Sequence, residues 1–356
     1  MRIAILGGGH GCYAAAADLT EQGHSVALWR RSASQFGELA SHKTLQLKDH
    51  AGQRAVALAT VTADIAIALD GATLVLIFTP AFAQEDVARA IAPHLTTEQT
   101  VFLAPGTFGT LAMARIVRQA GGAAATWAET GTLPYLARKH DGHTIAITIR
   151  AKHLPTGVFP AANTDKAIAV IQAAYPSVHA IEDALSGALM NAGPIIHPPL
   201  ILMNAGPLEH FEQWDIHNEG TQPAIRRVTD QLDAERIAIR ESFGYQPNHY
   251  PLSDHYNSDR WMYGDAHDRL TDSGDWREKI VLNSHRYMTE DVAYGLGLLV
   301  SVARYAATPA PIAESLLSLG RAVCSQQFMY GERSLKSLGV ADMSGSSLRR
   351  LLLDGL

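Results

Sequence analysis

The pattern of hydrophobic and polar positions changes once along the chain, near residue 183. Before that point, short apolar or β-branched runs alternate with helix-like stretches, an order typical of a parallel sheet with crossover helices. After it the strand signals stop and the remaining periodicity is helical. The sequence therefore predicts an α/β domain with a mostly parallel sheet over residues 1–183 and an all-α domain over residues 184–356.

Individual elements follow from the same pattern. Strands are predicted at residues 1–6, 25–29, 73–79, 100–104, 143–151, 157–160 and 178–182, and helices at 12–22, 84–95 and 165–174. In the second half, one apolar stripe predicts a helix that Pro223 opens and Gly244 closes. The polar and aromatic stretch from Tyr245 to Glu278 is long for a connection inside a compact domain, so we expect a functional loop there.

A glycine-rich turn joins the first predicted strand to the first predicted helix. In the segment Ile3-Ala-Ile-Leu-Gly-Gly-Gly-His-Gly-Cys12, the spacing fits G-x-G-x-x-G/A with a small cysteine in the third place. Such a turn lets backbone approach a pyrophosphate and points helix N-terminal amides at it. The placement predicts a Rossmann-like dinucleotide site, and an ordinary tight turn is the alternative. The predicted cofactor-binding residues of this turn are Gly7, Gly9, His10, Gly11 and Cys12.

The end of the second predicted strand indicates which dinucleotide binds. A site for NAD(H) typically places an acidic residue there to bond the ribose 2′-hydroxyl. The sequence has Arg30, Arg31 and Ser32 instead, and paired guanidinium donors suit a 2′-phosphate. NADP(H) is therefore favoured over NAD(H), and two solvated arginines in a loop are the alternative.

Two further turns follow buried strands. Thr79-Pro80 ends one strand and Ala104-Pro-Gly-Thr107 ends the next. Because the carboxyl ends of strands border the ligand crevice of an open α/β sheet, Thr79 and Pro80 are predicted to contact the cofactor. Thr107 is predicted to touch the substrate or the cofactor amide. Strand termination by proline and glycine explains the same residues equally well.

Composition narrows the classes of function. The chain has 356 residues, 47% hydrophobic and 18% charged, so two folded domains are expected and disorder is not. A net charge of −6 offers no cationic field to nucleic acid or an anionic membrane, and no stretch is a good membrane span. Two cysteines indicate a reducing, cytoplasmic location. His140 and His143 lack a third ligand at a recognisable spacing, so no metal is expected.

Four more segments stand out beside the glycine turn. They are Ala104-Pro-Gly-Thr-Phe-Gly109, Ala128-Glu-Thr-Gly-Thr-Leu-Pro-Tyr135, Asn191-Ala-Gly-Pro-Ile-Ile-His-Pro-Pro-Leu200 and Arg286-Tyr-Met-Thr-Glu-Asp-Val-Ala-Tyr-Gly295. Together with the turn they resemble the octopine/nopaline (opine) dehydrogenase family over most of the chain. The resemblance implies a Rossmann-like domain, a mostly helical domain, and NAD(P)H-dependent condensation of an amino acid with a 2-oxo acid such as pyruvate.

The implied reaction requires particular residues in the helical half. A proton shuttle near neutral pH suits histidine, and His197 is the candidate. By the family motif, Asp291 would hold the other ring nitrogen and Arg286 would bind a substrate carboxylate. Since five α-helical positions do not share a face, Arg286 is expected on a turn before a helix that Asp291 begins. The alternatives are that His197 is a core residue, that Asp291 is a first-turn acid favoured by the helix dipole, and that Arg286 is a surface cation.

Two further residues are candidates for substrate binding. Glu129 would meet the amino-acid ammonium or a basic side chain, and a carboxylate that caps a nearby turn is the alternative. Asn191 would bond the cofactor or substrate, although asparagine is also common near a helix start.

Two other functions stay open. Another two-domain NADP oxidoreductase, of the ketopantoate reductase or glycerol-3-phosphate dehydrogenase type, would rely on a lysine, but neither Lys279 nor Lys336 lies in a matching motif. A non-catalytic dinucleotide-binding sensor would not need His197, Asp291 and Arg286 to cluster. The expected partners are small-molecule substrates, and the C-terminal segment 347–353 allows a homodimer.

Overall fold

The computed structural model describes residues 1–257, 259–264, 280–324 and 333–356, and the chain forms two compact units. The N-terminal unit comprises Met1–Ala188 and Arg350–Leu356, and the helical unit comprises Leu189–Arg349. The sequence analysis predicted the domain boundary at residue 183 and assigned all of residues 184–356 to the helical domain. The contacts extend the first unit because α7 (Ala184–Ala188) packs on two strands of its sheet.

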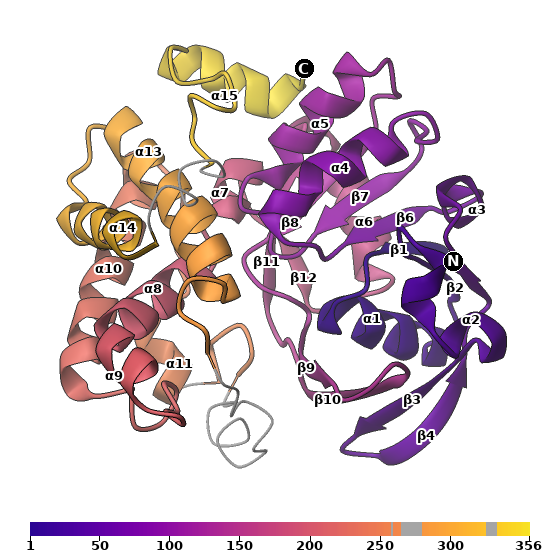
Figure 1. Cartoon of the computed structure of the whole chain (residues 1–356). Helices are drawn as coiled ribbons and strands as arrows, with labels where there is room; N and C mark the ends of the chain where they lie inside the picture. The colour runs from indigo at the N-terminus through magenta and orange to yellow at the C-terminus, as the bar shows by residue number, and fades with distance from the viewer. Residues whose placement is uncertain (258, 265–279, 325–332) are drawn as a thin grey trace. The chain divides into compact units, whose positions relative to one another are not determined.

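The N-terminal unit is built on an eight-stranded sheet. Its strands are β1 (Arg2–Leu6), β2 (Ser25–Trp29), β5 (Thr60–Thr62), β6 (Leu74–Ile77), β7 (Thr100–Leu103), β8 (Thr126–Thr130), β11 (Leu154–Phe159) and β12 (Val178–Ala180). The order is β12-β11-β8-β7-β6-β1-β2-β5, and all neighbours are parallel except β8 and β11 (Figure 1). This confirms the mostly parallel sheet and six of the predicted strands.

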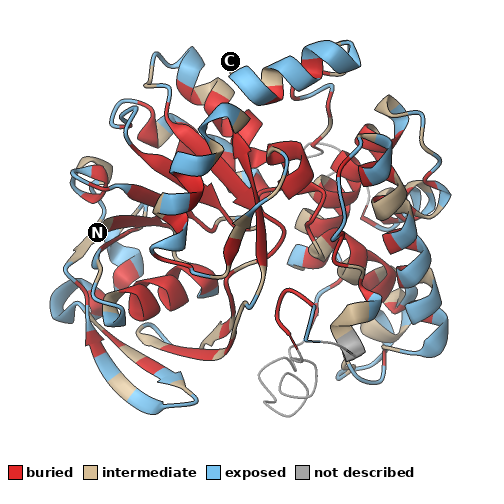
Figure 2. Ribbon diagram, turned by 180° about the vertical axis from the view of Figure 1, so that it is seen from behind, coloured by how far each residue is buried: buried red, intermediate tan, exposed pale blue. Residues whose placement is uncertain are grey.

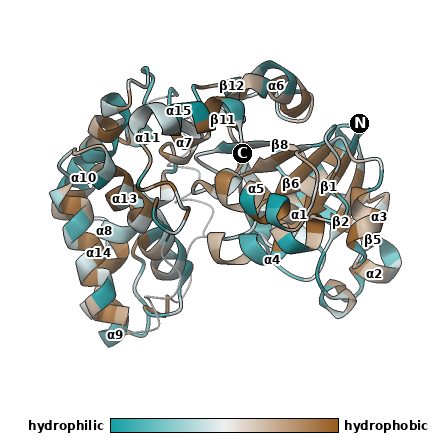
Figure 3. Cartoon of the chain, turned by 90° about the horizontal axis from the view of Figure 1, so that it is seen from above, coloured by the Kyte–Doolittle hydropathy of each residue, from teal (hydrophilic) through white to brown (hydrophobic). Residues whose placement is uncertain are grey.

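Helices follow the strands as crossover connections. They are α1 (His10–Glu21), α2 (Leu39–His42), α3 (Ile65–Leu69), α4 (Ala81–Ile91), α5 (Gly109–Gln119) and α6 (Thr164–Gln172), with short 3₁₀ turns η1 (Ala33–Phe36) and η2 (Ala161–Asn163). All residues of β6 and β7 are buried (Figure 2), and the strands are strongly apolar (Figure 3). A sheet covered on both faces requires such apolar strands.

A second, four-stranded sheet was not predicted. It consists of β3 (Thr44–Asp49), β4 (Gly52–Ala57), β9 (Tyr135–Lys139) and β10 (Thr144–Arg150) in the order β4-β3-β10-β9. The run predicted at 143–151 is β10, but it pairs here and not in the main sheet. The alanine-rich α1 contacts strands of both sheets. Its small side chains are buried all round, so the two sheets approach closely across it.

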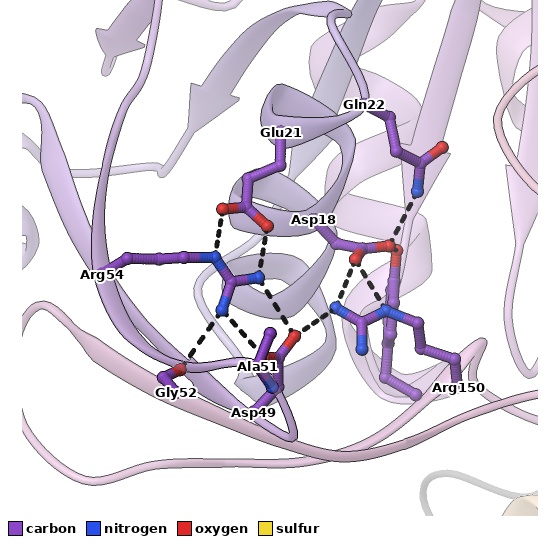
Figure 4. A network of polar contacts seen from close by, with 9 residues as sticks. Asp18, Glu21, Gln22, Asp49, Ala51, Gly52, Arg54 and Arg150 are labelled. Carbon is purple, nitrogen blue, oxygen red and sulfur yellow. Dashed lines mark hydrogen bonds and ion pairs between the residues drawn. The ribbon is translucent and has the colours of Figure 1, made fainter.

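A polar network fastens α1 to the second sheet (Figure 4). Asp18 of α1 accepts hydrogen bonds from Arg150 Nε at 2.7 Å and from the Tyr135 hydroxyl at 2.9 Å. Arg150 and Arg54 both donate to Asp49 at 2.7 Å. The two guanidinium groups hold the pKa of the Asp49 carboxyl well below its usual value, so β3, β9 and β10 are fixed against one helix.

The described part of the helical unit contains no strand. Its helices are α8 (Gly193–Met203), α9 (Ala205–His210), α10 (Pro223–Ser242), α11 (Ser253–Asn257), η3 (Tyr287–Leu296), α13 (Gly297–Tyr305) and α14 (Pro311–Cys324), and α15 (Gly345–Asp354) runs back into the N-terminal unit. The predicted helix over 223–243 is confirmed as α10. No helix among the described residues is both long and apolar enough to cross a bilayer.

The loop expected at Tyr245 to Glu278 is described only in part. Residues 258 and 265–278 lie outside the described residues, as does Lys279. Within the described portion, α11 occurs and Trp261 is 3% exposed. The functional role of this loop therefore stays a prediction.

Candidate active site

The predicted dinucleotide site lies where the strand order of the main sheet reverses. β1 pairs with β2 on one side and with β6 on the other, so the turns after β1 and β6 are adjacent. Gly7 follows β1 with φ of +133°, a conformation that L-residues with a side chain rarely adopt. Ligands of open α/β sheets bind at such a switch point.

The turn after β1 fits a pyrophosphate. A Cβ atom placed on Gly9 would meet no atom within 4 Å, so a ligand has open space in front of this backbone. Gly9 precedes the first residue of α1, the exposed His10, and Gly11 and Cys12 are buried in the first turn of the helix. Burial raises the pKa of the Cys12 thiol to about 11, so this cysteine is a packing residue.

The two arginines after β2 point to different places. Arg30 lies against the Gly8 backbone, where any Cβ atom would overlap its guanidinium group. Arg31 has a side chain that is 76% exposed and forms a 3.3 Å ion pair with Asp86 of α4. Ser32 bonds Ser34 at 2.8 Å. Of the three predicted residues, the structure brings Arg30 to the glycine turn.

Thr79 and Pro80 follow β6 beside the glycine turn. Thr79 Cγ2 lies 3.0 Å from the position of a Cβ on Gly7. Its Oγ1 atom is buried without a hydrogen-bond partner in the described residues, so a hydroxyl is available at the switch point. Thr107 is 2% exposed with φ of +54° and lies in the turn that leads to α5.

Glu129 holds the turn that contains Thr107 and leads to α5. It is fully buried on β8, and its Oε2 accepts the backbone N–H of Phe108 at 2.7 Å, while Oε1 accepts that of Thr110 at 3.3 Å. Thr110 Oγ1 also donates to Oε1. Since both carboxylate oxygens are engaged at the start of α5, the contacts favour the capping role over ammonium binding.

In the helical unit, a histidine and a carboxylate meet. His197 Nδ1 on α8 lies 2.7 Å from Asp291 Oδ2 on η3, and their side chains are 17% and 9% exposed. A carboxylate accepts only, so Nδ1 carries the proton and Nε2 of the neutral ring is left to accept one. This is the pairing that the resemblance implied.

The close packing of α8 against η3 sets this contact. A side chain at Gly193, in the first turn of α8, would overlap Asp291 Oδ1. Pro198 and Pro199 lie inside α8 and remove two helical N–H donors, so packing against neighbouring helices maintains this helix. Asn191 is 6% exposed, and its Oδ1 accepts the Gly193 N–H at 3.0 Å, which places it at the start of α8.

Tyr287 is a site residue that the sequence reasoning missed. Its ring stacks on His197 with centroids 3.7 Å apart and planes 10° apart, and it is 1% exposed. Its hydroxyl lies 3.0 Å from His217 Nε2, and the ring of His285 packs edge-on at 4.3 Å. The imidazole is therefore held on one edge by a carboxylate and on one face by a fixed ring. Tyr287 directly follows Arg286 in the family-like segment, which was the available signal.

Arg286 directly precedes the helix, as expected, but Asp291 does not begin that helix. The helix begins at Tyr287, so Asp291 lies inside it, and its hydrogen bonding is that of a π-helix. In a π-helix the i→i+5 pattern brings residues five apart onto one side, so Arg286 and Asp291 both act on His197. The prediction that Asp291 begins the helix is wrong, because the facing argument assumed α-helical geometry.

Burial dominates the electrostatics of His197. Burial lowers the pKa of His197 below the usual value, Asp291 raises it, and the nearby Arg286 and His285 lower it further. The ring is therefore neutral at pH 7 and is a base with a carboxylate beside it. In the described ranges, no three metal-ligating side chains cluster.

Comparisons with known proteins agree with this architecture. Residues 180–324 match the family described as NAD/NADP octopine/nopaline dehydrogenase, alpha-helical domain, and residues 3–119 match ketopantoate reductase PanE/ApbA. The opine dehydrogenase of Arthrobacter sp. (strain 1C) is 27% identical, covering 97% of this chain and 97% of its own. The vitopine synthase of Allorhizobium ampelinum (strain ATCC BAA-846 / DSM 112012 / S4) is 24% identical over 95% of each chain.

Solved structures show the same fold. Octopine dehydrogenase with NADH and pyruvate has a TM-score of 0.74 at 16% identity and covers 98% of each chain. Yersinopine dehydrogenase with NADP⁺ has a TM-score of 0.69 at 16% identity, covering 97% of this chain and 98% of its own.

A Rossmann-like unit followed by a helical unit with a paired histidine and carboxylate defines a two-domain NAD(P)-dependent oxidoreductase. Residues 180–324 carry a more specific likeness, because they match the model of the octopine/nopaline dehydrogenase alpha-helical domain. The resemblance seen in the sequence segments is confirmed.

Proposed function

We propose that this protein is an opine dehydrogenase that joins the amino group of an amino acid to a 2-oxo acid. The observation that carries the proposal is the contact of His197 Nδ1 with Asp291 Oδ2 inside a helical domain of this family. A pyridine nucleotide, when bound at the glycine turn, supplies the hydride that reduces the carbon–nitrogen double bond.

His197 is proposed as the proton-transfer residue. Nε2 of the neutral ring accepts the proton that the substrate ammonium must lose before its nitrogen attacks the 2-oxo carbon. The imidazolium then returns a proton to the carbinolamine oxygen, which leaves as water when the imine forms. Asp291 stabilises the imidazolium, which is charged between these two steps. Arg286 is the proposed partner of a substrate carboxylate.

The ketopantoate reductase alternative is weaker. Its match ends at residue 119, within the dinucleotide-binding part, and the helical part matches the octopine/nopaline dehydrogenase family. The sensor alternative does not need a histidine paired with a carboxylate, yet His197 and Asp291 are in contact.

A substrate panel tests the reaction. Amino acids are crossed with pyruvate, glyoxylate and 2-oxoglutarate while NADPH absorbance is followed. We expect oxidation only when an amino acid and a 2-oxo acid are both present, because the reducible bond forms from the two. Oxidation with a 2-oxo acid alone supports the ketopantoate reductase type, and cofactor binding without turnover supports a sensor.

NADP(H) is the proposed preferred cofactor, because Arg30 directly follows β2, where NAD-specific sites carry an acid, and lies against the glycine turn. Arg30→Ala is expected to raise the NADPH dissociation constant by about tenfold and to change that of NADH by less than about twofold. Arg31→Ala is the matched control, since Arg31 is exposed and paired with Asp86. Equal weakening of NADPH and NADH binding by Arg30→Ala contradicts the preference.

A cytoplasmic location is proposed as well, since both cysteines are buried free thiols.

A further inference from the structure

Lys139 approaches the glycine turn from the second sheet. It ends β9, and its Nζ donates to the Gly8 carbonyl at 3.3 Å. Its Nζ also lies 4.6 Å from the centroid of the Tyr13 ring, on the helix that follows the turn. This lysine belongs to neither the family-like segments nor the predicted cofactor site.

Two anchors fix the end of β9 against α1. The Lys139 backbone N–H donates to His10 Nδ1 at 2.8 Å, at the first residue of α1. The Tyr135 hydroxyl donates to Asp18 at 2.9 Å, near the other end of the helix. Because β9 is held at both ends, the lysine stem is directed at the turn, and its place does not depend on a flexible loop.

Arg30 and Lys139 converge on Tyr13 and Gly8. Arg30 Nη1 donates to the Tyr13 hydroxyl at 3.2 Å, while Lys139 lies over the ring of the same tyrosine. Tyr13 is fully buried, so it fixes both contacts. Burial and then the charge of Arg30 lower the pKa of Lys139, which shows that the two cations interact.

The described residues place no carboxylate in direct contact with Arg30 or Lys139, and the charge of Asp141 acts on Lys139 from a longer distance. Among the described residues, their contacts are hydroxyl, carbonyl and aromatic groups. Two cations held together repel each other, and a dianion between them relieves that repulsion. A phosphate monoester carries close to two negative charges and accepts bonds from both kinds of cation.

We infer that Lys139 and Arg30 together form the binding site for the 2′-phosphate of NADP(H), with Lys139 as a specificity-determining residue from the second sheet. The inference rests on the proposed pyridine-nucleotide site but not on the opine reaction. Arg30 supplies paired donors beside the Gly8 backbone, and Lys139 supplies a compact charge at the Gly8 carbonyl. The second sheet thereby contributes to cofactor choice.

The test measures binding without organic substrates. For Lys139→Met, which keeps an unbranched apolar stem over Tyr13, the NADPH dissociation constant is expected to rise by about tenfold and that of NADH by less than about twofold. Titrations with 2′-AMP and 5′-AMP distinguish the two phosphate positions. Only the binding of 2′-AMP should weaken. Lys139→Arg should restore most of the NADPH affinity because it restores the charge.

The controls separate a charge effect from misfolding. Lys48→Met removes an exposed lysine of β3 in the same sheet and should leave both dissociation constants unchanged. An unchanged NADPH constant in Lys139→Met overturns the inference, and so does equal weakening of NADH, which would place Lys139 on the pyrophosphate or in a structural role. A failed substrate panel with intact Lys139-dependent NADPH selectivity would remove only the opine reaction.

Discussion

His197→Ala is expected to lower kcat for condensation by about two to four orders of magnitude, the usual scale for a lost acid/base group. The dissociation constant of NADPH should change little, because His197 lies in the helical unit and its contacts are with Asp291 and Tyr287 of that unit. Steady-state kinetics with a fixed amino acid and 2-oxo acid, and a fluorescence titration of NADPH, measure the two quantities.

The size of the effect follows from the state of the ring. Its pKa is lowered by burial, so the neutral base is present throughout the neutral range. Added imidazole should restore part of the turnover in His197→Ala, since the vacated space lies beside Asp291. His210→Ala, an exposed histidine of α9, is the matched control and should keep normal turnover. Wild-type turnover in His197→Ala would remove this residue from the mechanism.

Local sequence signals predicted the parts of the fold that bury apolar runs. β1, β2, β6 and β7 are short apolar strands separated by helices, and each is confirmed. β8 was missed because its residues Thr126, Glu129 and Thr130 are polar yet buried. Glu129 is tolerated there because it caps the turn before α5, a contact that local periodicity does not reveal.

The second sheet and the site depend on contacts between distant parts of the sequence. Lys139 and Gly8 are 131 positions apart, and His197 and Asp291 are 94 apart, so neither pair is visible in any local window. The motif resemblance supplied the second pair and not the first. The π-helical form of η3 also escaped prediction, because spacing arguments assume the α-helical period.

Asp291→Asn is the second large effect that we expect, with kcat lowered by about two to four orders of magnitude, the scale seen when the carboxylate that orients a catalytic histidine is lost. Asparagine keeps the size of the side chain beside Gly193 but removes the charge. Its amide nitrogen can donate to Nδ1, which favours the wrong ring tautomer. Thermal unfolding should show the variant folded, and Glu290→Gln on the same helix is the matched control.

The pH profile distinguishes this role from a merely structural one. The negative charge of Asp291 raises the pKa of His197, so its removal lowers that pKa further. The base is protonated below its pKa, and kcat/KM therefore falls on the acidic side. In Asp291→Asn this acidic limb should move to lower pH, while the rate on the plateau falls. An acidic limb that stays in place, with reduced stability alone, would assign Asp291 to packing between α8 and η3 and not to the support of a proton-transfer histidine.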